Sequence, residues 1–328
     1  MKKIFFGILA MAAFAACSNE EQIAAPKGEA IAFGNAFVDN SVRAGEATDP
    51  SYGTHNSLTS FNVWGTVKGT TDPVAIFAGD AVTGVVGTHE EEGEDVPNVW
   101  NCTKTQYWIN GAKYNFAAVV NGEVTDLFEY NAEEPESYKK AHLPKTIKFD
   151  TPEAADVDLL YAPSLEYTGQ TSGNNELVKF DFAHLLSKVK FSVVNNSKAA
   201  AGYSFLVKDI KITAVDTANY DVEASQWGTG DTAKFALTEI SLTNNTATTV
   251  ESAAEKLIIP GTVSVEFVVD ILCNGTVITS TPYTYNNIAL EAGKAYSLKA
   301  QVAVGDPIQF TVEKNPTWTV VTPDTTLN

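Results

Sequence analysis

Residues 263–285 read VSVEFVVDILCNGTVITSTPYTY and carry a clear signal of secondary structure. Apolar side chains recur at every second position from Val263 to Cys273, and Val277, Tyr283 and Tyr285 share one face of the run after Asn274-Gly275. Period-two alternation is typical of a strand with one buried face, and Asn-Gly accepts the positive φ angles of a tight hairpin turn. The stretch therefore predicts two long antiparallel strands, 263–273 and 276–285.

Runs of the same kind recur along most of the chain, separated by turn residues. The runs cover residues 31–38, 58–67, 73–78, 99–109, 114–120, 146–149, 159–162, 177–182, 188–195, 203–213, 235–242, 257–259, 294–303 and 308–312. Short strands at this spacing predict an all-β chain of antiparallel β-sandwiches, and helical structure is expected only near 135–142 and in a turn at 183–187. The polar stretch 168–175, TGQTSGNN, resembles a linker, so we expect one domain over 44–172 and a second over 173–328.

Charge and composition exclude several classes of protein. The chain has 328 residues, with 22 Lys and Arg against 40 Asp and Glu, a formal net charge of −18. Such a charge repels phosphate backbones, so no nucleic-acid partner is expected. Three cysteines are too few for a disulfide scaffold, and Cys102 and Cys273 are expected to be free thiols.

The sequence contains no recognisable catalytic motif. It has no phosphate-binding glycine loop with lysine, no His-Glu-x-x-His, no Cys-x-x-Cys and no Gly-x-Ser-x-Gly. His184 lies among apolar residues and is expected in a core, bonded to backbone. The acidic run 90–95 could bind calcium, but a solvated loop is the simpler interpretation. We expect no enzyme activity, no cofactor and no metal.

The N-terminal residues form a targeting signal. Residues 1–16, MKKIFFGILAMAAFAA, combine two lysines with an apolar stretch that is too short to span a membrane. The following Ala15-Ala16-Cys17 resembles the lipobox of bacterial lipoproteins, although Phe14 replaces the usual leucine. The resemblance implies that Cys17 becomes the acylated first residue and anchors the protein to a membrane.

A short strand and a single arginine follow the lipobox. Ile31, Phe33 and Phe37 share one face of the alternating run 31–38. Arg43 is the only arginine in the chain and is followed by Ala44 in a polar stretch that is typical of an exposed loop.

Taken in order, several motifs resemble those of the fimbrillin family, the subunits of type V pili. They are the lipobox, the run 31–38, SVRA at 41–44, FNVWG at 61–65, DLLYA at 158–162, VKFDFAHLLSKVKF at 178–191, AGKAYSL at 292–298, and IQFTV at 308–312 with Trp318. The resemblance implies two transthyretin-like antiparallel β-sandwich domains in tandem and a structural role without catalysis.

The resemblance also implies a route of assembly. The lipoprotein reaches the outer membrane, and an arginine-specific or trypsin-like protease cuts between Arg43 and Ala44. The lipidated segment 17–43 then leaves with its strand, and a strand of another subunit fills the groove. The mature protein would be part of a fimbrium that supports adhesion, with other pilus subunits as partners.

Two points stay open at this stage. Candidate donor strands lie within 308–328, and the apolar side chains would come either from Ile308, Phe310 and Val312 or from Trp318, Val320 and Val321. The chain could alternatively be a tip adhesin on the same scaffold, binding a host or bacterial surface ligand. It could also be a surface glycan-binding lipoprotein that is never cut.

Overall fold

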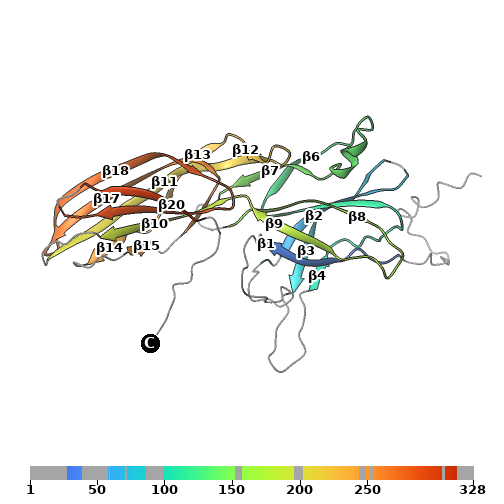
Figure 1. The fold of residues 1–328 in the computed structure, drawn as a ribbon, viewed down its shortest axis with the longest axis horizontal. Coiled ribbons are helices and arrows are strands. Elements are labelled where there is room, and N and C mark those ends of the chain that lie inside the picture. Colours follow the sequence, from blue (N-terminus) through green and yellow to red (C-terminus); the bar gives the residue numbers. More distant parts are fainter. Residues whose placement is uncertain are drawn as a thin grey trace, which may run out of the picture.

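The structure is a computed structural model of the chain. It describes residues 28–38, 58, 60–70, 72–85, 99–151, 157–195, 202–243, 249–251, 255–304 and 307–315. The molecule is elongated, with the N-terminal strands gathered at one end and the C-terminal strands at the other (Figure 1). Apart from one short 3₁₀ helix, every regular element in these residues is a β-strand, so the prediction of an all-β chain is confirmed.

The first seven-stranded sheet has the order β1-β9-β8-β5-β2-β3-β4. Its strands are β1 (Phe33–Val38), β2 (Ser60–Lys68), β3 (Val74–Val85), β4 (Val99–Cys102), β5 (Lys113–Val120), β8 (Leu160–Thr168) and β9 (Val178–His184). The sheet curls, since β1 at one end of this order also contacts β4 at the other. It encloses a core rich in aromatic side chains.

A glycine shows how tightly this core is packed. A Cβ atom on Gly65 of β2 would lie 2.7 Å from Cδ1 of Phe116, closer than side chains approach. The absence of a side chain at this position therefore lets the Phe116 ring lie against the backbone of the neighbouring strand.

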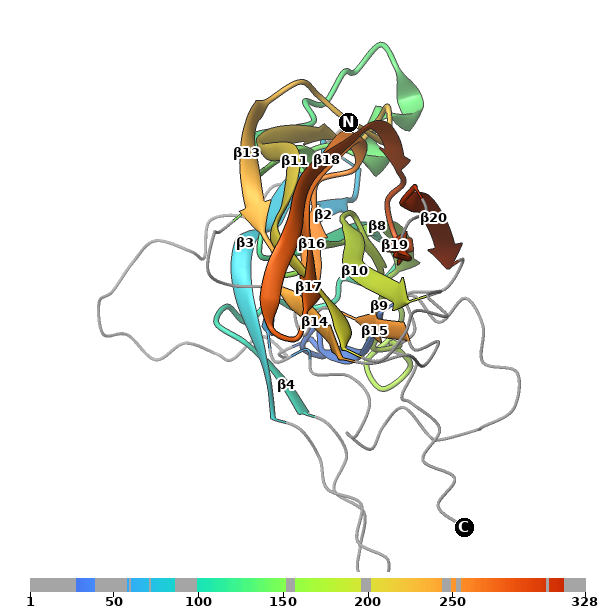
Figure 2. The same cartoon turned by 90° about the vertical axis from the view of Figure 1, so that its left-hand side faces the viewer.

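The C-terminal half consists of two sheets packed face to face (Figure 2). One has the order β15-β10-β19-β20, with β16 also on β10, and the other the order β18-β17-β11-β7-β6, with β12, β13 and β14 on β11. Their strands are β6 (Glu123–Leu127), β7 (Pro144–Asp150), β10 (Ser187–Asn195), β11 (Tyr203–Asp221), β12 (Gln226–Trp227), β13 (Asp231–Ala236), β14 (Ile240–Thr243), β15 (Thr249–Glu251), β16 (Lys256–Ile258), β17 (Gly261–Cys273), β18 (Thr276–Leu290), β19 (Ala295–Val302) and β20 (Gln309–Asn315).

The predicted hairpin is present in this half. β17 and β18 pair antiparallel from Gly261↔Leu290 to Cys273↔Thr276, with positive φ at Asn274 and Gly275. Most other pairs are antiparallel as expected, but β1 lies parallel to β9 and β10 lies parallel to β19.

The two halves are joined by strand pairing between segments that are distant in the sequence. The β6–β7 hairpin follows β5 in sequence, yet β7 pairs with the end of β11 in the C-terminal sheet. A shared core lies at this junction and includes Leu143, Ile147, Leu186 and Tyr220. The domain boundary that we expected between residues 172 and 173 falls in the loop 169–177. This loop connects β8 to β9, which are paired strands of the first sheet.

A partly buried ion pair lies in the C-terminal sheet. Lys208 of β11 contacts the carboxylate of Asp270 on β17, and the hydroxyl of Ser280 donates to the other oxygen at 2.6 Å. These two contacts hold the pKa of Asp270 below its usual range, with the lysine as the larger cause. A buried carboxylate requires such partners, so the contacts fix the register of β17 against both neighbours.

We predict that Phe267→Ala lowers the free energy of unfolding by about 3–5 kcal/mol, because the fully buried ring leaves a cavity between the sheets. The ring centroid lies 5.0 Å from that of Phe191 and 5.7 Å from that of Tyr283. Chemical denaturation of the full chain measures the effect. Val277→Ala, at an exposed position of β18, is the control and should change it by less than about 0.5 kcal/mol.

Candidate functional site

The segment that contains β1 is hydrogen-bonded on one side to residues 106–108, which lie between β4 and β5, and on the other side to β9. On one side, the Ile31 N–H donates to the Gln106 carbonyl at 2.8 Å and the Trp108 N–H donates to the Glu29 carbonyl at 2.9 Å. On the other side, the Val178 N–H donates to the Ala32 carbonyl at 2.9 Å, and β1 then runs parallel to β9. Loss of the segment would leave unpaired backbone groups on both sides.

The side chains of the same segment fill the core. Ile31 is 7% exposed and Phe33 is 5% exposed. The Phe33 ring centroid lies 5.7 Å from that of Phe77, 6.0 Å from that of Phe61 and 6.1 Å from that of Phe180. One side chain of β1 therefore contacts aromatic rings of three other strands.

A polar contact fixes the start of the segment. Oε2 of Glu29 accepts hydrogen bonds from the Gly173 N–H at 2.7 Å and from Nδ2 of Asn175 at 2.8 Å. The Asn175 amide, followed by the Gly173 N–H, holds the pKa of the Glu29 carboxyl below its usual range. The Gln170 N–H donates in turn to Oδ1 of Asn175 at 2.7 Å, which orients the amide.

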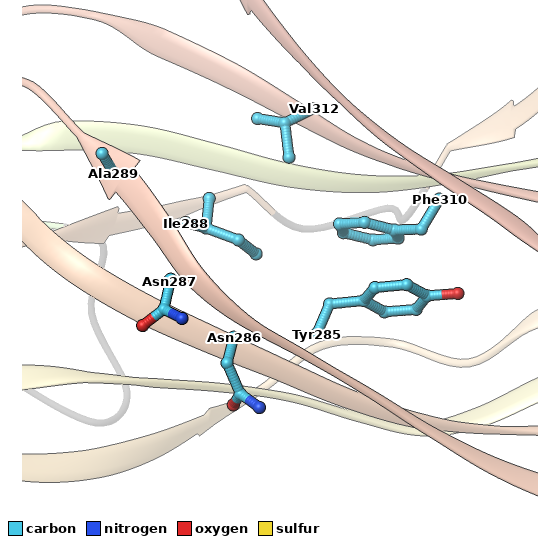
Figure 3. A pocket seen from close by; sticks show the side chains of 7 residues that line it. All are labelled: Tyr285, Asn286, Asn287, Ile288, Ala289, Phe310 and Val312. Atoms are coloured by element: carbon cyan, nitrogen blue, oxygen red, sulfur yellow. The ribbon is translucent and has the colours of Figure 1, made fainter.

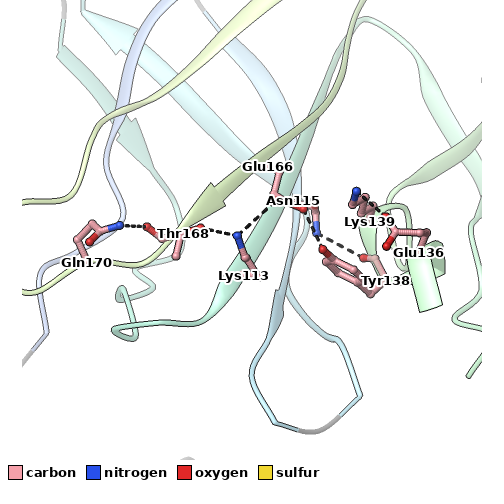
Figure 4. A network of polar contacts seen from close by, with 8 residues as sticks. All are labelled: Lys113, Asn115, Glu136, Tyr138, Lys139, Glu166, Thr168 and Gln170. Atoms are coloured by element: carbon pink, nitrogen blue, oxygen red, sulfur yellow. Dashed lines mark hydrogen bonds and ion pairs between the residues drawn. The ribbon is translucent and has the colours of Figure 1, made fainter.

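A hydrogen-bond network supports the strand that leads into this loop (Figure 4). Nζ of Lys113 donates to Oγ1 of Thr168 at 2.8 Å and pairs with Glu166 at 3.4 Å. The Tyr138 hydroxyl, from the 3₁₀ helix η1 (Pro135–Lys139), donates to the same Glu166 at 3.0 Å. The network ties η1 to β5 and β8, so residues 169–175 start from a supported strand end.

A polar hollow of about 450 Å³ lies beside the Glu29 contact. Its lining combines two aromatic rings with amides and carboxylates, from Trp108, Glu166, Tyr167, Thr168, Gln170, Asn174, Asn175 and Glu176. The indole of Trp108 packs edge-on against Tyr114, with ring centroids 4.7 Å apart. Aromatic faces beside amides suit sugar rings, and they serve equally well as structural packing.

The described part of the C-terminal candidate strand lies at a sheet edge. β20 pairs with β19 and ends the order of its sheet. Ile308 and Phe310 pack partly buried against the core, whereas Val312 is 41% exposed. The Phe310 ring stacks on Tyr285 with centroids 4.1 Å apart, beside a hollow of about 350 Å³ between β18 and β20 (Figure 3).

The remaining sequence predictions fall in different places. The backbone of Phe37 lies in β1 opposite Asp181. Cys17, Arg43, Ala44, Trp318 and Val320 lie outside the described residues, as do the signal segment 1–16 and the acidic run 90–95. The Glu29 contact was not foreseen, although Glu29 shares its parity with Ile31 and Phe33 and so belongs to the same strand pattern.

The described residues hold no candidate metal centre. They contain no group of three His, Cys, Asp or Glu side chains that could hold a metal ion, and none of their helices is long and apolar enough to cross a membrane. Nδ1 of His184 lies 2.5 Å from the Asp158 carboxylate, and this contact connects β9 to the segment before β8. Cys102 and Cys273 are both free and half-buried.

We predict that Phe33→Ala lowers the free energy of unfolding of the N-terminal half by about 3–5 kcal/mol, because three aromatic rings lose their common contact. Denaturation of the full chain, followed by tryptophan fluorescence, measures it. The exposed Ala32 provides the matched control as Ala32→Ser, and an equal loss in both variants would contradict a special role for the ring.

Comparison with known proteins places this architecture. The chain resembles the crystal structure of a fimbrial protein from Bacteroides vulgatus ATCC 8482, with a TM-score of 0.54 and 14% identity over 89% of this chain and 100% of that chain. It also aligns with a fimbrial assembly protein from Parabacteroides distasonis ATCC 8503, with a TM-score of 0.41 and 12% identity over 87% and 93% of the two chains. No curated protein matches the sequence.

The family assignment comes from the sequence itself. The model of the fimbrillin-like family matches residues 53–317, which is most of the chain. The resemblance that the ordered motifs indicated is therefore confirmed, and the chain belongs to the fimbrillin-like family.

Proposed function

We propose that the protein is a structural subunit of a type V pilus. It is exported as a lipoprotein acylated at Cys17, cut after Arg43 and polymerised by strand exchange. Membership of the fimbrillin-like family supports the general role, and the position of β1 supports the mechanism. The lipid would anchor the precursor in the outer membrane, and processing would release the mature subunit into a fimbrium on the cell surface.

The observation that carries the proposal is that a core-filling strand stands directly before the single arginine. β1 ends at Val38, and Arg43 follows within a polar stretch. A cut after Arg43 would separate the strand from the rest of the chain and leave it held by non-covalent contacts alone. Ile31 and Phe33 each contribute about 1.5–3 kcal/mol through burial, so the vacated groove favours a replacement strand.

The C-terminal strand supplies a candidate replacement. β20 is hydrogen-bonded to β19 and occupies the end of its sheet, so its release disrupts one strand pair. Entry of such a strand into the groove of another copy is β-augmentation, in which backbone bonds give affinity and alternate side chains give specificity. The contact joins different surfaces of the two subunits, so repetition produces an open filament.

A second candidate function is that of a tip adhesin on the same scaffold. The hollow between Trp108, Tyr167 and the 170–176 loop favours it, because aromatic rings next to amides and carboxylates suit a surface glycan. A surface glycan-binding lipoprotein that is never cut would use the same hollow. N-terminal sequencing of surface-exposed protein separates the two states, since Ala44 as first residue indicates processing and an acylated Cys17 indicates a static anchor.

We predict that Arg43→Ala reaches the membrane at wild-type level but forms at most about a tenth of the wild-type polymer, because the resident strand blocks the incoming one. Unboiled samples from cells at matched expression, resolved by gel electrophoresis, measure the polymer ladder.

Arg43→Lys is the matched control for charge. It should restore polymer if the protease is trypsin-like and fail if the protease accepts arginine alone. A full ladder from Arg43→Ala cells would contradict the proposed processing step.

We predict that Cys17→Ala abolishes acylation and leaves precursor or soluble protein in the periplasm, because no acyl chains remain to hold it at the membrane. Membrane fractionation and mass measurement of the N-terminal peptide check this. Partition with membranes at the wild-type level would contradict the lipoprotein assignment.

A further inference from the structure

The same short sequence pattern occurs twice in the chain, and the acidic residue of its second copy, Asp306, lies outside the described residues. An acidic residue followed by Ile at the second and Phe at the fourth following position is found at 29–33, Glu-Ala-Ile-Ala-Phe, and again at 306–310, Asp-Pro-Ile-Gln-Phe. These are the two places in the sequence where this pattern occurs. The first copy forms the start of the segment that fills the groove, and the second copy leads into β20.

The acidic position of the first copy has a defined receptor. The Gly173 N–H and Nδ2 of Asn175 both point at one oxygen of Glu29, at 2.7 and 2.8 Å. The backbone N–H of Gln170 donates to Oδ1 of Asn175 at 2.7 Å and orients the amide. Departure of Glu29 would remove the acceptor and leave both donors oriented, which is the arrangement that binds a carboxylate.

We infer that Gly173 and Asn175 form a carboxylate receptor that sets the register of the incoming strand, and that its ligand is Asp306 of a second copy of this chain. Ile308 then takes the place of Ile31, and Phe310 takes the place of Phe33 among the aromatic rings. The inference rests on the proposed function, and it selects the run that begins at Asp306 over the run that contains Trp318 and Val320.

The intervening positions of the second copy fit the backbone of the first. Ala30 and Ala32 are exposed. The side chains of Pro307 and Gln309, which would take these two positions, would therefore point to solvent. The two backbone hydrogen bonds beside position 30 use the Ile31 N–H and the Glu29 carbonyl. A proline at position 30 lacks only its own N–H, so both hydrogen bonds are kept. The carbonyl at position 32 accepts from Val178, and Gln309 retains that carbonyl.

The direction of the incoming strand and the length of the matching segment follow from the same comparison of the two copies. The order acid, Ile, Phe runs from N to C in both copies, so the incoming strand enters in the direction of β1, parallel to β9. The match ends at the Phe position, because β1 has a register shift between Phe33 and Ala36 and the second copy has Thr311 in place of Gly34. The alternative run has Pro316 two residues before Trp318, so it offers no carboxylate to the receptor.

The first test exchanges sequences within the full-length precursor and needs no polymer. One variant combines Glu29→Asp, Ala30→Pro and Ala32→Gln, and its melting temperature should stay within about 3 °C of the parent. A second variant carries the alternative run as Glu29→Pro, Ala30→Thr, Ile31→Trp, Ala32→Thr and Phe33→Val, and it should melt at least about 6 °C lower or fail to fold. Equal losses in both variants, or failure of the first to fold, would overturn the inference.

The second test measures assembly in cells that express the full chain. Asp306→Asn should reduce the polymer about three- to tenfold, because the receptor loses a charged acceptor, and Asp306→Glu should retain it. Asp324→Asn is the control for charge in the C-terminal region and should leave the ladder unchanged. Equal ladders from Asp306→Asn and wild type would overturn the role of the receptor.

The two tests separate this inference from the proposed function. Absence of polymer from wild-type cells would refute strand exchange, while the melting temperatures would still decide whether the groove accepts the 306–310 sequence. Normal wild-type polymer with failure of the first exchange variant would leave strand exchange standing and assign the donor to another run.

Discussion

The contact of Phe33 with Phe61, Phe77 and Phe180 is the interaction on which the N-terminal half depends. The three partner rings come from strands that are distant in sequence, and Phe33 is the side chain that they share. The same segment also supplies backbone partners to the 106–108 edge and to β9. A strand that closes both the core and the sheet leaves a large apolar groove when it is absent, so this half requires an occupant at all times.

The core of the C-terminal half is closed in a different way. Its core is closed by the face-to-face sheets, with β10 and β19 on one side and β11 and β17 on the other. The Phe310 ring of β20 stacks on Tyr285 and on Phe267, and Val312 is 41% exposed. The loss of β20 would therefore open one edge of its sheet, whereas the loss of β1 would remove Phe33 from inside the first core. In the proposed strand exchange, the N-terminal half would be the acceptor and the edge strand β20 would be supplied to another copy.

The strands were predictable from the sequence because alternation and turn residues are local signals. Asn274-Gly275 and its flanking runs became the β17–β18 hairpin, as expected. The prediction for β11 ended at 213, whereas the strand continues to Asp221, because polar residues such as Asp216 and Asn219 interrupt the apolar pattern there. These polar positions still pair with β7, a strand from the other half of the chain, and such long-range pairing leaves no local signature.

The candidate site was predictable in its apolar part and missed in its polar part. Ile31 and Phe33 follow the period of a buried strand, and the structure buries both. Glu29 is an ordinary surface acid by sequence, since its partners Gly173 and Asn175 lie more than 140 residues away in a stretch with the composition of a linker. Hydrogen bonds across such distances depend on how loops are placed by the fold.

Glu29 matters because apolar alternation alone leaves the register of a strand ambiguous. A shift by two residues keeps every large side chain on the buried face, so a groove that recognised only period two would accept several alignments. Phe33 reduces the number of possible alignments, because its ring fills the space between three other rings. Another aromatic residue of the strand could still occupy that space if the strand shifted by two residues. A charged residue bound at one fixed point is different, because a two-residue slip removes the carboxylate from both donors and places another side chain beside them. The polar contact at Gly173 and Asn175 thus supplies what the aromatic core lacks, a fixed origin from which the apolar positions of the strand are counted.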